Sequence, residues 1–269
     1  MAVLAISSEV ARGHVGLSAA RFALQRLGHQ VFALPTVILS NHPGHPHVAG
    51  TRTEPDVLRR MLDALDQNGW LGEVDAVLTG YLPAADHVSV AAEAIRRVRP
   101  GTLIVVDTVL GDDPKGLYVD EAAARAVRDQ LLPLASIITP NRFEASWLSG
   151  IEVTADPATA LAAALKLSVP TVVITSAPSP EPGTLDNLMI RNKKVVRARV
   201  PKLEHAPHGT GDLLAALIAG ESLEMPAEAA FAKAVAIVKH VLDLSAGADE
   251  LALVAAQEGW AELAPWSLS

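Results

Sequence analysis

The segment His208-Gly209-Thr210-Gly211-Asp212 combines residue types that can bind a phosphate and accept a proton. An apolar run, Leu213 to Ile218, follows it directly, so the sequence predicts a glycine-rich turn that opens into a helix. Such a turn directs unpaired N–H groups and the positive end of a helix dipole at one point, where negative charge is stabilised. An aspartate there could take the proton of a hydroxyl group that attacks a phosphoryl group. In the alternative interpretation, Asp212 only caps the helix.

Further polar residues come where short apolar runs of the sequence end. They are Ser8, Thr79-Gly80-Tyr81, Asp107, Asn141 and Thr175-Ser176. Ligands of open α/β sheets bind beyond the carboxyl ends of parallel strands. If the apolar runs are parallel strands, these polar residues gather at one edge of the sheet.

Strand-like runs alternate with Ala- and Leu-rich helical segments along the chain. We expect strands at 3–6, 30–34, 75–79, 103–106, 136–139 and 171–175, and a hairpin over 185–200 that turns near Asn192-Lys193. We expect helices at 16–27, 55–67, 87–98, 120–132, 143–148, 157–167, 213–220, 228–245 and 250–257. This alternation is typical of a mostly parallel sheet covered by helices on both faces. No linker interrupts the pattern, so we expect one domain over residues 1–269, with the Pro178–Gly183 stretch as a surface loop.

The composition excludes several classes of function. The net charge is −8 and no basic stripe is present, which argues against nucleic-acid binding. A basic cluster at Arg191–Arg199 is most simply a solvated hairpin face. The chain has no cysteine, which rules out disulfides and thiolate chemistry. No apolar run approaches the length of a membrane span or resembles a signal peptide, so we expect a cytoplasmic protein.

Seven blocks of the sequence, taken in order, resemble the pyridoxal kinases of the ribokinase-like superfamily. They are Ser8–Gly16, Thr36–Gly44 with its Ser-Asn-His, Leu78–Leu82 with its Thr-Gly-Tyr, Val106–Asp112, Thr139–Glu144, Val173–Ser176 and Gly209–Asp212. The resemblance spans nearly the whole chain. It implies a single-domain three-layer α/β/α fold with small β-hairpin additions, a homodimer, and ATP-dependent phosphorylation of the 5′-hydroxymethyl group of pyridoxal, with pyridoxine and pyridoxamine as further acceptors.

The resemblance also implies roles for individual residues. Asp212 would be the base, with an ordinary pKa of about 4, and Gly209, Thr210 and Gly211 would form the anion hole. Asp107 and Glu144 would organise Mg²⁺, largely through water, and a monovalent cation such as K⁺ is a further expected cofactor. The ATP site would include these two acids with Asp112, Asn141, Thr175 and Ser176 near the phosphates, and Leu203 near the adenine. For Glu144, the alternative is an acid that only stabilises the start of a helix.

The acceptor ring would lie in a flat apolar slot. By resemblance its residues are Ser8, Val37, Leu39, His42, Pro43 and Tyr81, with Asp212 at the reacting hydroxyl. The chain departs from the family pattern at Glu9, Leu39, Pro43 and Thr108, where relatives tend to have His, Phe, Thr and Pro. The departures at Leu39 and Pro43 leave the choice of acceptor open.

Three other functions remain open. The first is a hydroxymethylpyrimidine kinase of the same superfamily, in which a cysteine typically stands at the position of Asp212. The second is a protein that binds B6 vitamers without catalysis. Sugar and nucleoside kinases are a weaker third, because neither their di-glycine signature nor a lid is evident in the sequence.

Overall fold

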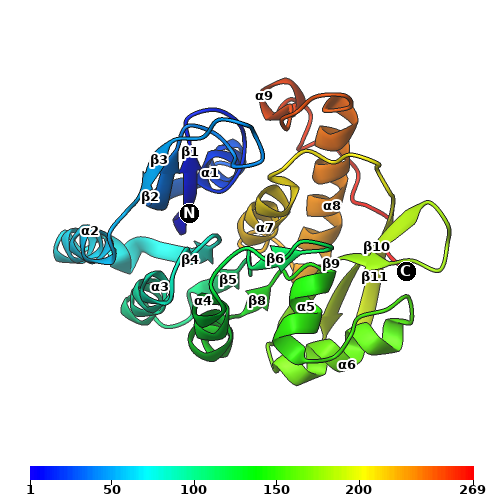
Figure 1. Cartoon of the computed structure of the whole chain (residues 1–269), viewed down its shortest axis with the longest axis horizontal. Coiled ribbons are helices and arrows are strands. Elements are labelled where there is room, and N and C mark those ends of the chain that lie inside the picture. The colour runs from blue at the N-terminus through cyan, green and yellow to red at the C-terminus, as the bar shows by residue number, and fades with distance from the viewer.

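A nine-stranded sheet forms the centre of the computed structural model, which describes residues 1–269 (Figure 1). Its strands are β1 (Ala2–Val10), β2 (Gln30–Leu39), β3 (Gly50–Arg52), β4 (Val74–Thr79), β5 (Leu103–Val106), β8 (Ile137–Ile138), β9 (Thr171–Pro178), β10 (Thr184–Arg191) and β11 (Lys194–Pro201). They lie in the order β11-β10-β9-β8-β5-β4-β1-β2-β3. The six strands from β9 to β2 run parallel, and β3, β10 and β11 join the two edges as antiparallel strands. The predicted mostly parallel α/β sheet is confirmed.

Helices cover both faces of the sheet, as the alternating sequence pattern predicts. The helices are α1 (Leu17–Arg26), α2 (Pro55–Gln67), α3 (Ala85–Arg97), α4 (Glu121–Ala126), α5 (Arg142–Ser149), α6 (Pro157–Leu167), α7 (Thr210–Glu221), α8 (Ala227–Leu244) and α9 (Leu253–Ala256). Helices α2 to α6 share one apolar core with one face of the sheet, and α1, α7 and α8 share a second core with the other. The side chains of β9 show the reason: Val172 and Ile174 belong to the first core and Val173 to the second.

Two predicted helices are shorter in the structure. The segment expected to be helical over 120–132 has a regular α-helix only to Ala126, followed by a π-turn at Val127–Leu131 and a 3₁₀ turn at Leu132–Leu134. Pro133 cannot donate the hydrogen bond that would continue an α-helix. Near the C-terminus, the helix expected over 250–257 is limited to α9. Before α9, the Glu250 side chain is bound by Arg12 and the N–H of Ala252 donates to the Ser245 hydroxyl.

The predicted hairpin is formed by β10 and β11, which turn through Asn192 and Lys193 with φ of 51° and 64°. Its basic residues are not merely a solvated face, which corrects the expectation from the sequence. Arg197 and Arg199 both pair with Asp186, whose side chain is buried. The last residue, Ser269, exchanges two backbone hydrogen bonds with Arg197, so the C-terminus lies against β11 (Figure 1).

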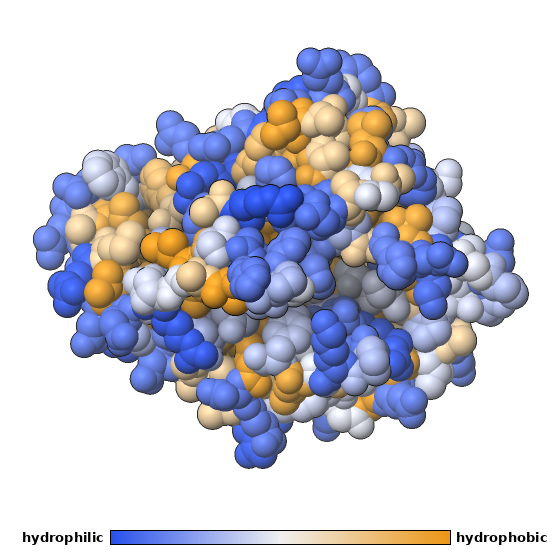
Figure 2. Space-filling model, turned by 45° about the horizontal axis from the view of Figure 1, so that its top comes forward, coloured by the Kyte–Doolittle hydropathy of each residue, from blue (hydrophilic) through white to orange (hydrophobic).

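On the face shown in Figure 2, hydrophilic residues are interspersed with smaller hydrophobic patches. None of the helices combines the length and apolarity that crossing a membrane requires. The arrangement most relevant to function is the edge at which the parallel strands end, where β6 (Gly111–Asp112) and β7 (Gly116–Leu117) form a small separate ribbon.

Candidate active site

The carboxyl ends of the parallel strands bring several of the predicted polar residues together. Asp107 follows β5, and its Oδ1 accepts a 2.7 Å hydrogen bond from the hydroxyl of Thr139, which follows β8. Asn141, which follows β8, forms a parallel β-bridge with Thr175 of β9. Two pairs of polar residues, Asp107 with Thr139 and Asn141 with Thr175, therefore lie together at the edge predicted from the sequence.

The turn before α7 has the backbone geometry that the glycine pattern predicts. Gly209 is the N-cap residue, with φ of 92°, and a Cβ at this position would lie 1.9 Å from the carbonyl oxygen of His14. Only glycine fits so close an approach with a positive φ. The N–H groups of Thr210 and Gly211 stand in the first turn of α7, where a helix offers no backbone acceptor. They remain available to an anion.

Asp212 lies in this first turn but is not the N-cap residue, which is Gly209. Burial raises the pKa of Asp212 to about 6, although the N–H groups of Gly16 and of Asp212 itself stabilise its ionised form. The expected ordinary pKa of about 4 is therefore wrong. Asp212 is a stronger base than an exposed aspartate and is still mostly ionised at pH 7.

Asp107 faces the same space from β5. Its side chain is only 8% exposed, and burial raises the pKa of its carboxyl well above the usual range, helped by the negative charges of Asp212 and Glu144. The three acids thus form a cluster whose charges repel one another. Asp107 and Asp212 line the same cavity, and their carboxylate oxygens are ligands of the kind that a hard cation such as Mg²⁺ prefers.

Glu144 holds together the loop that connects β5 to β6. Its buried carboxylate accepts from the N–H of Leu110 at 2.7 Å and from the hydroxyl of Thr108 at 3.0 Å. It also completes a capping box with Asn141 at the start of α5. Burial raises the pKa of Glu144 to about 7, and these donors limit the rise. Thr108 stands where the family pattern has proline, and its hydroxyl adds a hydrogen bond to Glu144 that a proline could not make.

The polar side chains predicted to lie near the phosphates differ in whether hydrogen bonds or ion pairs within the chain already occupy them. The side-chain amide of Asn141 is already used, since Oδ1 accepts from Glu144 N and Nδ2 donates to Gly111 O. Asp112 is exposed and bonds only its neighbour's N–H, whereas Asp113 pairs with Arg142. Of the two adjacent aspartates, Asp112 is the one without a cationic partner among the ion pairs of the structure.

The remaining residues predicted for the ATP site are Thr175, Ser176 and Leu203, which lie further along the chain at the same edge of the sheet. The N–H of Thr175 donates to Pro140 O, and the exposed Ser176 has a φ of 55°. Leu203 is 38% exposed in the segment after β11. Thr175 is thus fixed beside Asn141, whereas no contact in the structure ties Leu203 to the others.

On the acceptor side, Val37 is buried and Leu39 is half-buried, and both lie on the same side of β2. Tyr81 is fixed through its backbone, because its carbonyl accepts from the Thr36 hydroxyl at 2.7 Å, and burial raises the pKa of its phenol. Glu9 turns away to helix α1, where it pairs with Arg21 at 3.1 Å. The family's histidine is therefore replaced by a group engaged elsewhere.

Ser7 is a site residue that the sequence did not single out. Its hydroxyl accepts from the N–H of Tyr81 at 3.0 Å, and with Thr79, Asp107 and Asp212 it lines a cavity of about 10 Å³, roughly the space of one water. The predicted Ser8 instead lies against Gly16, where a Cβ would come 2.2 Å from its Oγ. Side chains alternate along a strand, so two consecutive serines face opposite ways, and the sequence alone does not say which faces Asp212.

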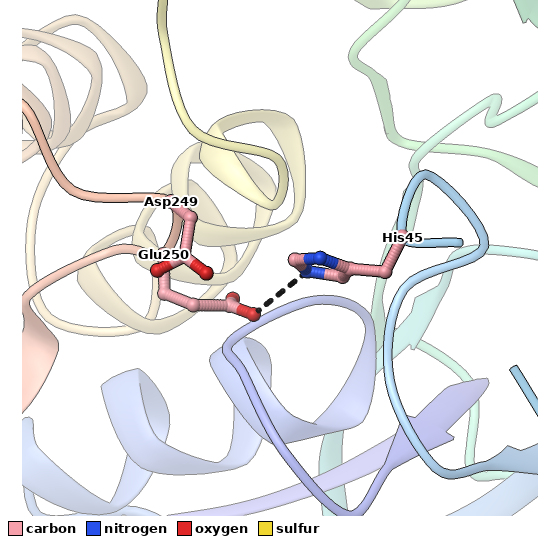
Figure 3. Close-up of side chains that lie close together, drawn as sticks. All are labelled: His45, Asp249 and Glu250. Atoms are coloured by element: carbon pink, nitrogen blue, oxygen red, sulfur yellow. Dashed lines mark ion pairs between the residues drawn. The ribbon is translucent and has the colours of Figure 1, made fainter. Parts of the chain in front are cut away.

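A loop over residues 40–49, between β2 and β3, carries the predicted His42 and Pro43. His42 is half-buried and Pro43 is exposed. The same loop reaches the C-terminal part of the chain, where His45 Nε2 lies 3.4 Å from a carboxylate oxygen of Glu250 (Figure 3). With Asp249 these side chains could offer three metal ligands. Arg12, however, pairs with both acids, so a guanidinium already offsets one of their two negative charges.

The sequence is similar to known proteins over nearly its whole length. Residues 22–252 match the family model described as phosphomethylpyrimidine kinase. The pyridoxal kinase PdxY of Rubrobacter xylanophilus is 38% identical over 268 residues, covering 95% of this chain and 92% of the relative. The PdxY of Corynebacterium diphtheriae is 34% identical and covers 96% of this chain and 95% of the relative.

Solved structures give the same result. The pyridoxal kinase of Leishmania donovani in complex with ADP and pyridoxamine superimposes with a TM-score of 0.91 at 33% identity, covering 98% of this chain and 97% of that one. The pyridoxal kinase of Entamoeba histolytica superimposes with a TM-score of 0.92 at 25% identity, covering 99% and 98%. The chain therefore belongs to the pyridoxal kinase family and has its ribokinase-like fold.

Proposed function

We propose that this chain transfers the γ-phosphoryl group of ATP to the 5′-hydroxymethyl group of pyridoxal, with pyridoxine and pyridoxamine as further acceptors. One observation carries the proposal: Asp212, a carboxylate with a raised pKa, stands beside the free N–H groups of the Gly209–Gly211 turn at the start of α7. A base and an anion-binding turn at one point are what phosphoryl transfer to an alcohol requires. The names of the relatives point to the same substrates.

In the proposed reaction, the hydroxyl oxygen attacks the γ-phosphorus in line with the leaving ADP. The new O–P bond forms as the bond to the β-phosphate oxygen breaks, and Asp212 accepts the hydroxyl proton. The N–H groups at Thr210 and Gly211 stabilise the charge on the transferring phosphoryl oxygens, with Gly209 allowing the turn. With a pKa of about 6, Asp212 accepts the proton more readily than an ordinary aspartate.

Mg²⁺ bound with ATP would neutralise phosphate charge. The acids at the carboxyl edge would hold it, with Asp107 facing the space directly and Glu144 acting mainly through water and through the loop that it fastens. Asp112, Asn141, Thr175 and Ser176 would lie near the phosphates and Leu203 near the adenine. The same acidic edge would suit a monovalent cation such as K⁺.

The acceptor ring would lie between the apolar residues of β2 and the Tyr81 turn. Val37 and Leu39 supply the apolar wall and Tyr81 an aromatic edge. His42 and Pro43 would border the ring from the 40–49 loop. The hydrogen-bonding group on β1 would be Ser7, which lines the cavity beside Asp212, in place of the predicted Ser8. We also propose a single kinase domain over residues 1–269 that works as a cytoplasmic homodimer.

An assay with ATP and Mg²⁺ and a panel of pyridoxal, pyridoxine, pyridoxamine and hydroxymethylpyrimidine tests the function. The pyrimidine is included because the matching family model is described as a phosphomethylpyrimidine kinase. We expect the highest kcat/KM with pyridoxal. A preference for the pyrimidine would overturn the choice of substrate. Tight vitamer binding without turnover would instead indicate a binding protein.

A further inference from the structure

His208 directly precedes the anion-binding turn and stacks on a residue far away in the sequence. Its imidazole lies against that of His42, with ring centroids 3.8 Å apart and ring planes 20° from parallel. His42 belongs to the 40–49 loop after β2, whereas His208 belongs to the segment that leads into α7. The stack is therefore a side-chain link between the proposed ring-binding loop and the phosphate-binding turn.

The hydrogen bonding of His42 defines which of its nitrogens carries a proton. The N–H of Gly44 donates to His42 Nδ1 at 3.0 Å, so Nδ1 is the acceptor and a neutral ring carries its proton on Nε2. Burial, and then the nearby His208, His45 and Lys115, lower the pKa of His42 to about 4. Burial and Lys115 also lower the pKa of His208. Both rings are thus neutral near pH 7, and His42 offers a donor at Nε2.

Gly44 packs against both stacked histidine rings. A Cβ at this position would lie 2.9 Å from His42 Nδ1 and 3.3 Å from His208 Nε2, so the backbone of the loop packs against both rings. The contact of His45 with Glu250 holds the same loop at a second point (Figure 3). The orientation of His42 is therefore set from three sides: by the Gly44 N–H, by the His208 ring and by the anchored loop.

We propose that His208 is a positioning residue for the acceptor, because its ring holds the His42 imidazole in the orientation that presents Nε2–H to an oxygen substituent of a flat heteroaromatic ring. The proposal rests on the proposed function. A donor at this position favours acceptors whose substituent can accept a hydrogen bond, such as the aldehyde of pyridoxal. The protonated aminomethyl group of pyridoxamine can only donate, so it gains nothing from Nε2–H.

The test compares His208→Ala, which removes the stacked ring, with His208→Phe, which keeps a flat ring without its nitrogens. His205→Ala is the matched control, because His205 is an exposed histidine of the same segment. For His208→Ala we expect KM for pyridoxal to rise about three- to tenfold with KM for ATP unchanged. The preference for pyridoxal over pyridoxamine should fall by the same factor. His208→Phe should restore both values.

A double-mutant cycle with His42→Ala separates positioning from a general structural effect. If His208 acts through His42, His208→Ala should have no further effect on the pyridoxal KM once His42 is alanine. An equal effect in both backgrounds would overturn the proposal. Kinetics of His208→Ala that match those of His205→Ala would overturn it as well.

A readout without catalysis distinguishes failure of this proposal from failure of the proposed function. Equilibrium binding of pyridoxal without ATP provides this readout, because it needs no phosphoryl transfer. We expect Kd for pyridoxal to rise about three- to tenfold in His208→Ala and to return to the wild-type value in His208→Phe. If the wild type bound pyridoxal but phosphorylated no vitamer, the proposed function would fail, and an unchanged Kd in His208→Ala would overturn the positioning role separately.

Discussion

The two halves of the candidate site are built in different ways. On the phosphate side, Asp107 and Glu144 are 8% and 3% exposed, and each is fastened by hydrogen bonds to backbone or hydroxyl groups at strand ends. On the ring side, His42 and Pro43 belong to a loop of half-buried and exposed residues. A ring stack, a contact to Glu250 and a backbone hydrogen bond from Arg12 N–H to the Ser40 carbonyl hold this loop. The reaction chemistry thus depends on strand ends and the start of α7, whereas acceptor choice depends in part on side chains of a surface loop.

This difference predicts how each half responds to substitution. The groups buried at strand ends are each held by hydrogen bonds to neighbouring groups. A substitution there therefore leaves buried polar atoms without partners and lowers either the reaction rate or the stability of the fold. Groups on the loop can change with little effect on the sheet, and should alter KM for the acceptor more than kcat. Substitutions on both sides test this contrast.

The largest effect is expected for Asp212→Asn, which keeps the shape of the side chain but removes the base. We expect kcat to fall by about 10²- to 10⁴-fold, with pyridoxal binding retained. The unfolding temperature without ligands should not fall, because the change removes one of three mutually repelling acids. Steady-state kinetics, equilibrium binding and thermal unfolding measure the three quantities.

The wild-type pH profile provides the control for Asp212→Asn. Since the pKa of Asp212 is raised to about 6, kcat/KM should fall about tenfold per pH unit below that value, and the acidic limb should be absent in the asparagine variant. An unchanged kcat in Asp212→Asn would show that the base lies elsewhere.

A second prediction concerns the stability of the phosphate side. Burial raises the pKa of Glu144 from 4.5 to about 7, so the folded protein holds a proton that the unfolded chain releases. The stability from this proton is complete below about pH 4.5 and is lost as the pH rises through about 7, which amounts to about 3 kcal/mol at most. Denaturant unfolding at several pH values, without nucleotide or metal, should show this decline.

Glu144→Gln is the matched variant for this decline. It should be less stable at every pH, because an amide nitrogen cannot accept the bonds of Leu110 N or Asn141 N. Its stability should, however, change less between pH 4.5 and 7 than that of the wild type. An identical pH slope in the two proteins would contradict the assignment to Glu144.

A smaller effect is expected where one bond of the same network is removed. Thr108→Val keeps the shape of the side chain and deletes the hydroxyl that donates to Glu144. The unfolding free energy should fall by about 1 kcal/mol, and kcat should fall with it because the loop before β6 loses a fastening. Thr51→Val, at an exposed position of β3, serves as the control.

Much of this organisation could be predicted from the sequence, because it depends on local signals. Apolar runs and glycines located the strands and the α7 turn, and strand-end residues located the edge. Long-range contacts could not be predicted in this way. Three features depend on segments that meet only in the folded chain. They are the choice of Ser7 rather than Ser8 to face Asp212, the bond from Thr108 to Glu144 and the stack of His42 on His208. The raised pKa of Asp212 likewise follows from burial, which the motif does not specify.

The smallest effects are expected on the ring side, where Leu39 stands in place of a family phenylalanine. Leu39→Phe should restore an aromatic wall and change KM for pyridoxal by about two- to tenfold, while kcat stays within about twofold because no group of the phosphate edge moves. The direction depends on Gly50 of β3, since a Cβ at that position would come 2.7 Å from Leu39 Cδ2 and little room is left there. A lower KM would mean that β3 yields to the larger ring, and a higher KM that it does not. A large loss of kcat would contradict the separation of the two halves, because the ring-side wall of β2 would then also position the reacting groups.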